Sequence, residues 1–146
     1  MDLTTSYPRS VRDEFAGVVM LGRATDKGRA LAAGTNGEYR YNCPMDQAIF
    51  GFLGIDSETY FAKLEQLDDV RLEAWVKENY VSQKSQAEIV AWNAQFLQRG
   101  PAPGSDSEQY FLELRNQVAP ERTDVTNWPD LLDLDEKRQV PVRVKA

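Results

Sequence analysis

The stretch Cys43-Pro-Met-Asp-Gln-Ala-Ile-Phe-Gly-Phe-Leu-Gly-Ile55 decides the fold class of this chain. Pro44 suits the first turn of a helix, where a backbone N–H has no helical partner, and apolar residues follow at spacings of three and four. Gly54 followed by Ile55 is typical of a Schellman ending, in which a left-handed glycine closes the helix. The stretch therefore predicts a short helix with a defined start and a defined end.

The same spacing recurs in both directions along the chain, whereas two-residue alternation is nearly absent. Upstream, we expect a short helix over residues 10–15, broken by Gly17, and a longer one over about residues 22–33, closed by Gly34. The inward stripe of the longer helix is expected to be Met20, Ala24, Lys27 or Gly28, and Leu31.

Downstream, short helices are separated by residues that cap helix starts. The capping candidates are Asp56 or Ser57, Asp68 or Asp69, Ser85 with Glu88, and Ser105 or Asp106. Pro129 then opens a last short helix.

Together these signals predict an all-α or mainly α protein, folded as a single compact domain of about six to eight short helices. The breaker Pro101-Ala-Pro-Gly104 suggests a helical core over residues 1–100 and an extension over residues 101–146. We expect the extension to pack on the same core, because it is too small to hold its own. The alternating tail from Val140 to Lys145 suggests a minor two-stranded β edge with residues 38–42.

Composition excludes several classes of function. The chain has no histidine and one cysteine, so zinc sites and histidine-dependent nucleophile pairs are not expected. The formal net charge of −6 opposes binding to nucleic acid and to anionic membranes. The acidic residues between Asp130 and Glu136 lack the spacing of a calcium loop, and no metal or cofactor is expected. No apolar run is long enough for a membrane span and the N-terminus does not resemble a secretory signal, so we expect a cytoplasmic protein.

Motifs in the first hundred residues carry a resemblance to a known family. In chain order they are Tyr7-Pro-Arg-Ser10, Asp26-Lys27, Gly34 through Tyr41, Cys43-Pro-Met-Asp46, Phe52-Leu-Gly-Ile55 and Ala91-Trp-Asn93. Over about residues 3–100 the chain resembles a family of bacterial proteins known as domain of unknown function 5069. The later segment resembles an extension of longer members. The resemblance implies a family and supplies no activity, substrate or catalytic residue.

Cys43 is the candidate catalytic residue. A thiol just before a helix start faces unpaired backbone N–H groups and the positive end of the helix dipole, which favour the thiolate. Arg40 would add a second positive field. The competing interpretation is an inert thiol that serves as a half-buried cap, because the chain offers neither a second cysteine nor a histidine base.

The candidate ligand-binding residues are Arg23, Lys27, Tyr39, Arg40 and Tyr41. Their positive charges and aromatic rings suit a small anion such as a phosphate or carboxylate, or a protein partner. The competing interpretation packs both tyrosines on the core and leaves the cations on a solvated helix face, with Asp26 paired to Arg23 or Arg29.

Three functional hypotheses follow. The leading one is a small helical binding module for a protein or a small anionic ligand, and an enzymatic role is not favoured. The second is a thiol enzyme or redox-responsive protein acting through Cys43. The third is a structural or oligomeric partner joined through the tail or an apolar helix face. The sequence leaves the oligomeric state open.

Overall fold

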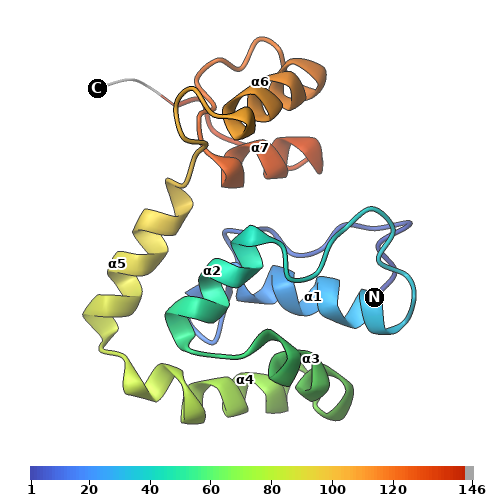
Figure 1. Ribbon diagram of the computed structural model, residues 1–146, viewed down its shortest axis with the longest axis vertical. Coiled ribbons are helices and arrows are strands. Elements are labelled where there is room, and N and C mark those ends of the chain that lie inside the picture. Colours follow the sequence, from blue (N-terminus) through green and yellow to red (C-terminus); the bar gives the residue numbers. More distant parts are fainter. Residues whose placement is uncertain (144–146) are drawn as a thin grey trace. The chain divides into compact units, whose positions relative to one another are not determined.

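The computed structural model describes residues 1–143 and shows a mainly α-helical protein (Figure 1). These residues contain seven α-helices, one short 3-10 helix and one two-stranded antiparallel sheet. The predicted fold class, mainly α with a minor β element, is therefore confirmed. The chain forms two compact units, Met1–Asn93 and Ala94–Ala146. That residues 101–146 pack on the same core as residues 1–100 stays a prediction.

The first unit holds the sheet and most of the helices. Its elements are β1 (Glu14–Phe15), β2 (Val18–Val19), α1 (Leu21–Ala32), α2 (Pro44–Leu53), α3 (Ser57–Gln66), α4 (Asp69–Asn79), the 3-10 helix η1 (Val81–Gln83) and most of α5 (Gln86–Leu97). Helix α1 packs against α2 and α3. Large side chains from these helices, including Ile49, Tyr60 and Leu72, are completely buried.

The segment before α1 forms a turn and a hairpin, so the predicted helix over residues 10–15 is wrong. The carboxylate of Asp13 accepts the N–H of Ser10 at 3.1 Å, and such local bonds compete with helix formation. The chain then reverses at Ala16 and Gly17, whose φ angles are 57° and 80°. Two successive positive φ angles are the geometry of a tight two-residue hairpin turn.

Distant side chains hold this hairpin in place. Asn93 of α5 donates from Nδ2 to the carbonyl of Gly17 at 3.0 Å and accepts the N–H of Val19 at 3.1 Å. Glu73 of α4 accepts the N–H of Ala16 at 3.0 Å. The hairpin therefore depends on residues that lie more than fifty positions further along the chain.

Helix α1 lies within one residue of its predicted bounds. Of the predicted inward stripe, Met20, Ala24, Lys27 and Gly28 are buried. The prediction that Leu31 faces inward is wrong. This residue is 42% exposed, because the last turn of α1 reaches the surface. Gly34 follows with a φ of 71°, as expected for a residue that closes a helix.

The short helices end and begin where the local signals predict. Ile55 N–H donates to the carbonyl of Phe50 at 2.9 Å, the long bond of a Schellman ending. The N-caps are confirmed at Asp56, Asp68, Ser85 and Ser105.

The predicted β edge between residues 38–42 and the tail is not formed by the described residues. Neither residues 38–42 nor residues 140–143 contain a strand, and Val144 and Lys145 lie outside the described residues. The tail is bonded within its own unit instead: Arg143 N–H donates to Asp124 at 2.8 Å.

The second unit contains the end of α5, α6 (Asp106–Val118) and α7 (Trp128–Asp135). Its small core is formed by Phe111, Val125 and Leu131, with Trp128 packed edge-on against Phe111. No helix among the described residues combines the length and the apolar character that crossing a membrane requires.

Candidate functional site

Lys27 lies inside the protein rather than on a solvated helix face. Lys27 is only 4% exposed, although lysine is rarely buried to this extent. Its ammonium nitrogen Nζ lies 2.8 Å from Asp46 Oδ2, 3.0 Å from the carbonyl oxygen of Arg40 and 3.3 Å from Cys43 Sγ. We call Lys27, Asp46 and Cys43 the Lys27 cluster.

The start of α2 positions two members of this cluster. Cys43 is the N-cap residue, and Cys43 and Asp46 form the reciprocal pair of a capping box. In that pair the backbone N–H of Cys43 donates to Asp46 Oδ2 at 3.2 Å. Pro44 at the first turn fixes the backbone between them. The cap therefore directs both the thiol and the carboxylate toward α1.

The Lys27 cluster places an ion pair in a water-poor environment. Asp46 is completely buried, and its Oδ1 has no hydrogen-bond partner among the described residues. Burying two charges is unfavourable unless they are paired well, and breaking such a pair leaves an uncompensated charge. The cluster thus strongly favours one arrangement of α1 and the start of α2.

The remaining predicted cations have different surroundings. Arg23 is 3% exposed, donates from Nη1 to the carbonyl of Arg9 at 3.2 Å, and lies 5.6 Å from the ring centre of Tyr39. Arg40 is exposed, and none of the ion pairs among the described residues involves its guanidinium. One predicted cation therefore faces solvent, while Arg23 and Lys27 lie beneath the loop of residues 35–43.

Tyr41 anchors the far end of this loop. Its ring packs against the rings of Phe61 and Phe50, with distances between ring centres of 5.4 Å and 6.0 Å. Its hydroxyl donates to the carbonyl of Ser57 at 2.9 Å. Burial, aided by the nearby charge of Asp46, raises the pKa of Tyr41 above its ordinary range. Tyr41 and Tyr39 thus contact different neighbours and do not form one aromatic wall.

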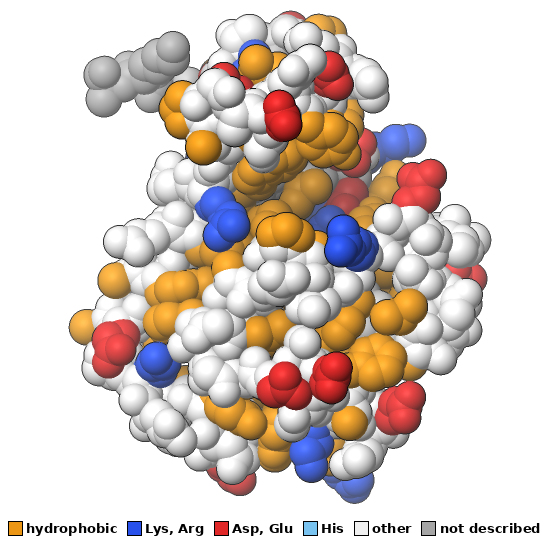
Figure 2. Space-filling model, in the orientation of Figure 1, with side chains coloured by type: hydrophobic (Ala, Val, Ile, Leu, Met, Phe, Trp, Pro, Cys, Tyr) orange, Lys and Arg blue, Asp and Glu red, His pale blue; other side chains and the backbone are white. Residues whose placement is uncertain are grey.

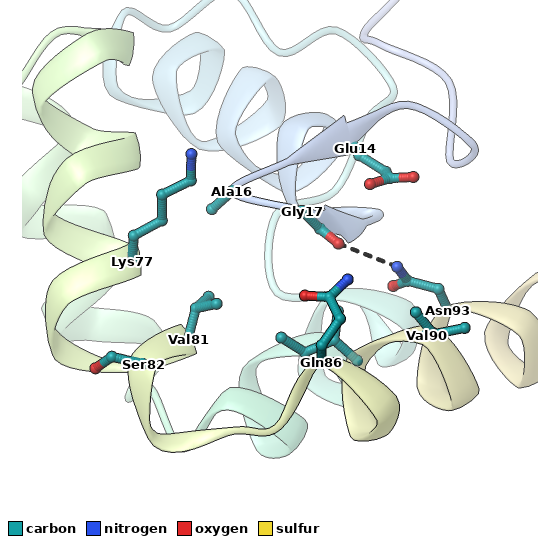
Figure 3. Close-up of a pocket in the computed structure, with 10 residues that line it drawn as sticks. Glu14, Ala16, Gly17, Lys77, Val81, Ser82, Gln86, Val90 and Asn93 are labelled. Atoms are coloured by element: carbon teal, nitrogen blue, oxygen red, sulfur yellow. Dashed lines mark hydrogen bonds between the residues drawn. The ribbon is translucent and has the colours of Figure 1, made fainter.

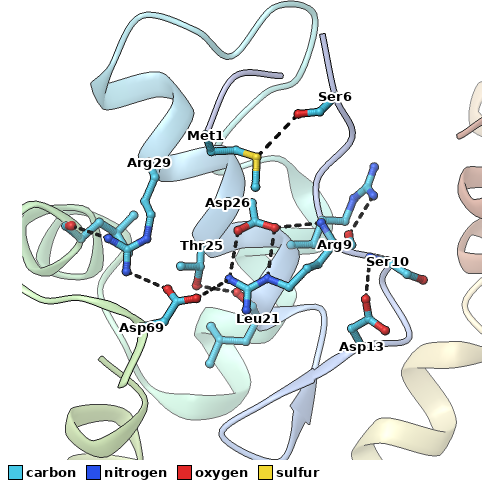
Figure 4. Close-up of polar contacts among 12 residues, drawn as sticks. Met1, Ser6, Arg9, Ser10, Asp13, Leu21, Thr25, Asp26, Arg29 and Asp69 are labelled. Atoms are coloured by element: carbon cyan, nitrogen blue, oxygen red, sulfur yellow. Dashed lines mark hydrogen bonds and ion pairs between the residues drawn. The ribbon is translucent and has the colours of Figure 1, made fainter. Parts of the chain in front are cut away.

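Asp26, expected to pair with Arg23 or Arg29, pairs with Arg9 instead (Figure 4). Arg9 donates two hydrogen bonds to the Asp26 carboxylate, from Nε at 3.1 Å and from Nη2 at 2.9 Å. Asp69 of α4 bridges the two arginines, lying 3.4 Å from Arg9 and 2.9 Å from Arg29. This network ties the N-terminal segment to α1 and α4, and it engages both Arg9 and Arg29 in ion pairs.

A separate pocket of about 620 Å³ lies between the hairpin and the helices that hold it (Figure 3). Its wall combines apolar side chains such as Val81 and Ile89 with the opposite charges of Glu14 and Lys77. The sequence interpretation missed it. The one available signal was the Ala91-Trp-Asn93 motif, because Asn93 both lines the pocket and holds the hairpin.

Charge is dispersed over the visible surface. On the face shown in Figure 2, lysine and arginine side chains lie singly or in small groups among aspartate and glutamate. Within residues 1–143, no three cysteine or acidic side chains are placed to share a metal ion. The acidic residues near α7 form ion pairs instead. Arg143 donates two hydrogen bonds to the carboxylate of Asp130, and Arg138 pairs with Glu136.

The fold and these contacts define a small, mainly helical protein with a buried lysine cluster beneath an ordered surface loop. The family model described as Domain of unknown function (DUF5069) matches residues 5–138, and the chain belongs to this family. The match also covers residues 101–138, the segment that we expected to resemble an extension of longer members. No curated protein matches the chain.

Proposed function

We propose that the chain is a small binding module that takes a carboxylate or phosphate group at the loop of residues 35–43. One observation carries the proposal. The guanidinium of Arg40 is exposed, while the carbonyl of the same residue is held from beneath by the buried ammonium of Lys27 at 3.0 Å. A charged side chain that is free to bind therefore sits on a backbone that is already fixed.

Further hydrogen bonds support a loop conformation that is fixed without a ligand. Asn36 donates from its side chain to the carbonyl of Tyr39 at 2.9 Å, and Gln47 donates to the carbonyl of Asn42 at 2.9 Å. A preformed loop loses little conformational entropy on binding, which favours affinity.

The candidate residues divide into two roles under this proposal. Arg40 supplies the planar, two-pronged donor that suits carboxylates and phosphates, and Tyr39, the preceding residue, offers a half-exposed ring. Arg23, Lys27 and Tyr41 position the loop and do not contact the ligand. A nucleic-acid partner is not proposed, since the net charge is −6 and the visible basic side chains are dispersed.

A titration with inorganic phosphate, and separately with acetate, tests the proposal by following backbone amide NMR signals. We expect saturable shifts concentrated in residues 36–43, lost in Arg40→Ala and kept in Arg71→Ala, which removes one exposed arginine elsewhere in the same unit. Shifts spread evenly over the surface, or unchanged in Arg40→Ala, would refute binding at this loop.

The titration also separates two sources of the anionic group. Saturation by free phosphate or acetate indicates a small-molecule ligand. If neither saturates, a peptide library rich in aspartate and glutamate is the next probe, and selective retention by the wild type over Arg40→Ala indicates a protein partner. Failure of both probes contradicts the proposal.

A second candidate function is thiol chemistry at Cys43, favoured by the 3.3 Å contact between its Sγ and Lys27 Nζ. It predicts that alkylation of Cys43 near neutral pH is faster in the folded protein than in denaturant. Slower alkylation in the folded protein would leave Cys43 as a structural cap.

A further inference from the structure

The Lys27 cluster holds a nucleophilic nitrogen against a thiol in a fixed arrangement. Lys27 Nζ lies 3.3 Å from Cys43 Sγ, and its bonds to Asp46 and to the Arg40 carbonyl restrict its movement. Lys27 and Asp46 are both at most 4% exposed, whereas Cys43 is half-buried and borders solvent. The sequence contains no other cysteine with which Cys43 could pair within the chain.

We propose that Cys43 and Lys27 form a covalent nitrogen–sulfur cross-link, a sulfenamide, when the protein meets hydrogen peroxide. In the first step Sγ attacks the peroxide, the O–O bond breaks, and one oxygen stays on sulfur as a sulfenic acid while the other leaves as water. Sulfur is oxidised by two electrons and the peroxide is reduced by two.

The second step needs no further oxidant. Nζ attacks Sγ, the N–S bond forms, and the S–O bond breaks to release hydroxide, which takes up a proton and leaves as water. A sulfenic acid condenses in the same way with a backbone nitrogen, and here a lysine amine occupies the attacking position. The net change in the protein is the loss of two hydrogen atoms.

Asp46 supplies the base that this step requires. An ammonium must lose a proton before its nitrogen can attack, and Asp46 Oδ2 lies 2.8 Å from Nζ. The same carboxylate carries the buried Oδ1 that has no hydrogen-bond partner among the described residues. An acceptor with unused capacity beside the reacting pair is the second observation, besides the short Nζ–Sγ distance, that points to this chemistry.

The cross-link does not depend on anion binding at Arg40. It would nevertheless remove the ammonium charge that holds the Arg40 carbonyl, so oxidation would also alter the loop of residues 35–43.

Intact-mass measurement after treatment with a small excess of peroxide tests the proposal. The folded wild type should become about 2 Da lighter, and a thiol reductant should restore the original mass. After digestion, the peptides containing Lys27 and Cys43 should be joined. Trypsin should no longer cut after Lys27, while cleavage after the exposed Lys77 continues.

Variants and a denatured sample supply the controls. Cys43→Ser should show no mass loss, and Lys77→Arg should behave like the wild type. Lys27→Arg, which keeps the charge, should accumulate a sulfenic acid that dimedone traps. If Lys27→Arg fails to fold, the comparison of folded wild type with wild type in denaturant still decides, because only the folded chain holds the two atoms together.

Several results would overturn the proposal. One is stable sulfenic or sulfinic acid on the folded wild type without mass loss. Another is a disulfide-linked dimer as the main product. A cross-link about 14 Da heavier than the untreated chain would show that oxygen is retained between nitrogen and sulfur, and would rule out the direct bond proposed here.

Discussion

At the scale of single residues, the central feature is a lysine placed where lysines seldom lie. Lys27 is almost completely buried and contacts a carboxylate, a backbone carbonyl and a thiol at the same time. Each contact compensates part of the cost of removing the ammonium from water. The residue therefore links the stability of α1 to the conformation of the loop that follows it.

Replacing Lys27 tests the energetic side of this arrangement. Lys27→Met leaves the carboxylate of Asp46 buried without a counter-ion, and we expect a loss of about 3–5 kcal/mol in the free energy of unfolding. Adding Asp46→Asn removes the uncompensated charge and should recover more than about 1 kcal/mol, since the two changes act on one pair. Urea denaturation of the single and double variants measures both effects. Additive losses would contradict a coupled pair.

Two tyrosines, the buried Tyr60 and the half-buried Tyr41, make a prediction about alkaline pH. Burial raises the pKa of both Tyr41 and Tyr60, so the folded state favours their neutral forms. Their contribution to stability is complete below the ordinary tyrosine pKa of about 10 and is lost as pH rises from there toward the folded values. The free energy of unfolding should fall above that pH, and less steeply in Tyr41→Phe.

Tyrosinate absorbance provides the measurement. Two of the six tyrosines should ionise only when the helical circular dichroism is lost. Ionisation of all six near the ordinary pKa, with the fold intact, would contradict the burial of these side chains.

At the scale of elements, α1 and α3 approach each other closely at a glycine. A Cβ placed on Gly28 would lie 2.4 Å from Leu64 Cδ1 and 3.1 Å from Tyr41 Cε1. The absence of a side chain at this position therefore allows the two helices to pack and lets Tyr41 lie over α1.

A matched pair of alanine substitutions tests this contact. Gly28→Ala should reduce the free energy of unfolding by about 1–3 kcal/mol, because Leu64 and Tyr41 must move. Gly51→Ala, in helix α2 with open space around the added carbon, should instead stabilise the protein by about 0.5–1 kcal/mol. Denaturant unfolding of both variants is the readout. A neutral or stabilising Gly28→Ala would mean that the helices are not so tightly packed.

The elements that local chemistry specifies are the ones that the sequence predicted well. Helix α2 and its ending at Gly54 follow from a proline, a cap and a glycine within one short stretch. The hairpin was missed because its turn at Ala16 is held by Glu73 and Asn93, which come from distant helices.

The candidate site was predicted only in part, for a related reason. Lys27 and Cys43 were each singled out by residue type and local position. Their contact, however, depends on how α1 packs against α2, which no local pattern reveals. The helical spacing placed Lys27 or Gly28 on the inward stripe, and the contacts of Lys27 with Asp46 and with the Arg40 carbonyl explain how a charge is tolerated there.

At the scale of the whole molecule, the second unit has a small core of its own. Phe111, Val125 and Leu131 are buried together. Arg143 in the tail donates two hydrogen bonds to the carboxylate of Asp130. A segment of about fifty residues is close to the lower size limit for a domain that is stable by itself. We therefore expect the chain to unfold in one cooperative transition.

Leu131→Ala tests this prediction through amide hydrogen exchange. The substitution empties a fully buried site and should destabilise the protein by about 2–5 kcal/mol. If the chain is one domain, the slowest-exchanging amides of α1 and α2 should lose protection by the same factor as those of α6. Loss of protection confined to residues 94–143 would show two independently stable units.

The most direct test of the account is the NMR signal of the Lys27 ammonium in the unmodified protein. Exposed lysine ammonium protons exchange rapidly with water, whereas those of Lys27 are bonded to Asp46, Arg40 and Cys43. We predict a slowly exchanging ammonium signal from Lys27 that shifts in Cys43→Ala, while exposed Lys77 gives none under the same conditions. A Lys27 ammonium that exchanges as fast as that of Lys77 would contradict the buried cluster, and with it both the preformed loop and the proposed cross-link.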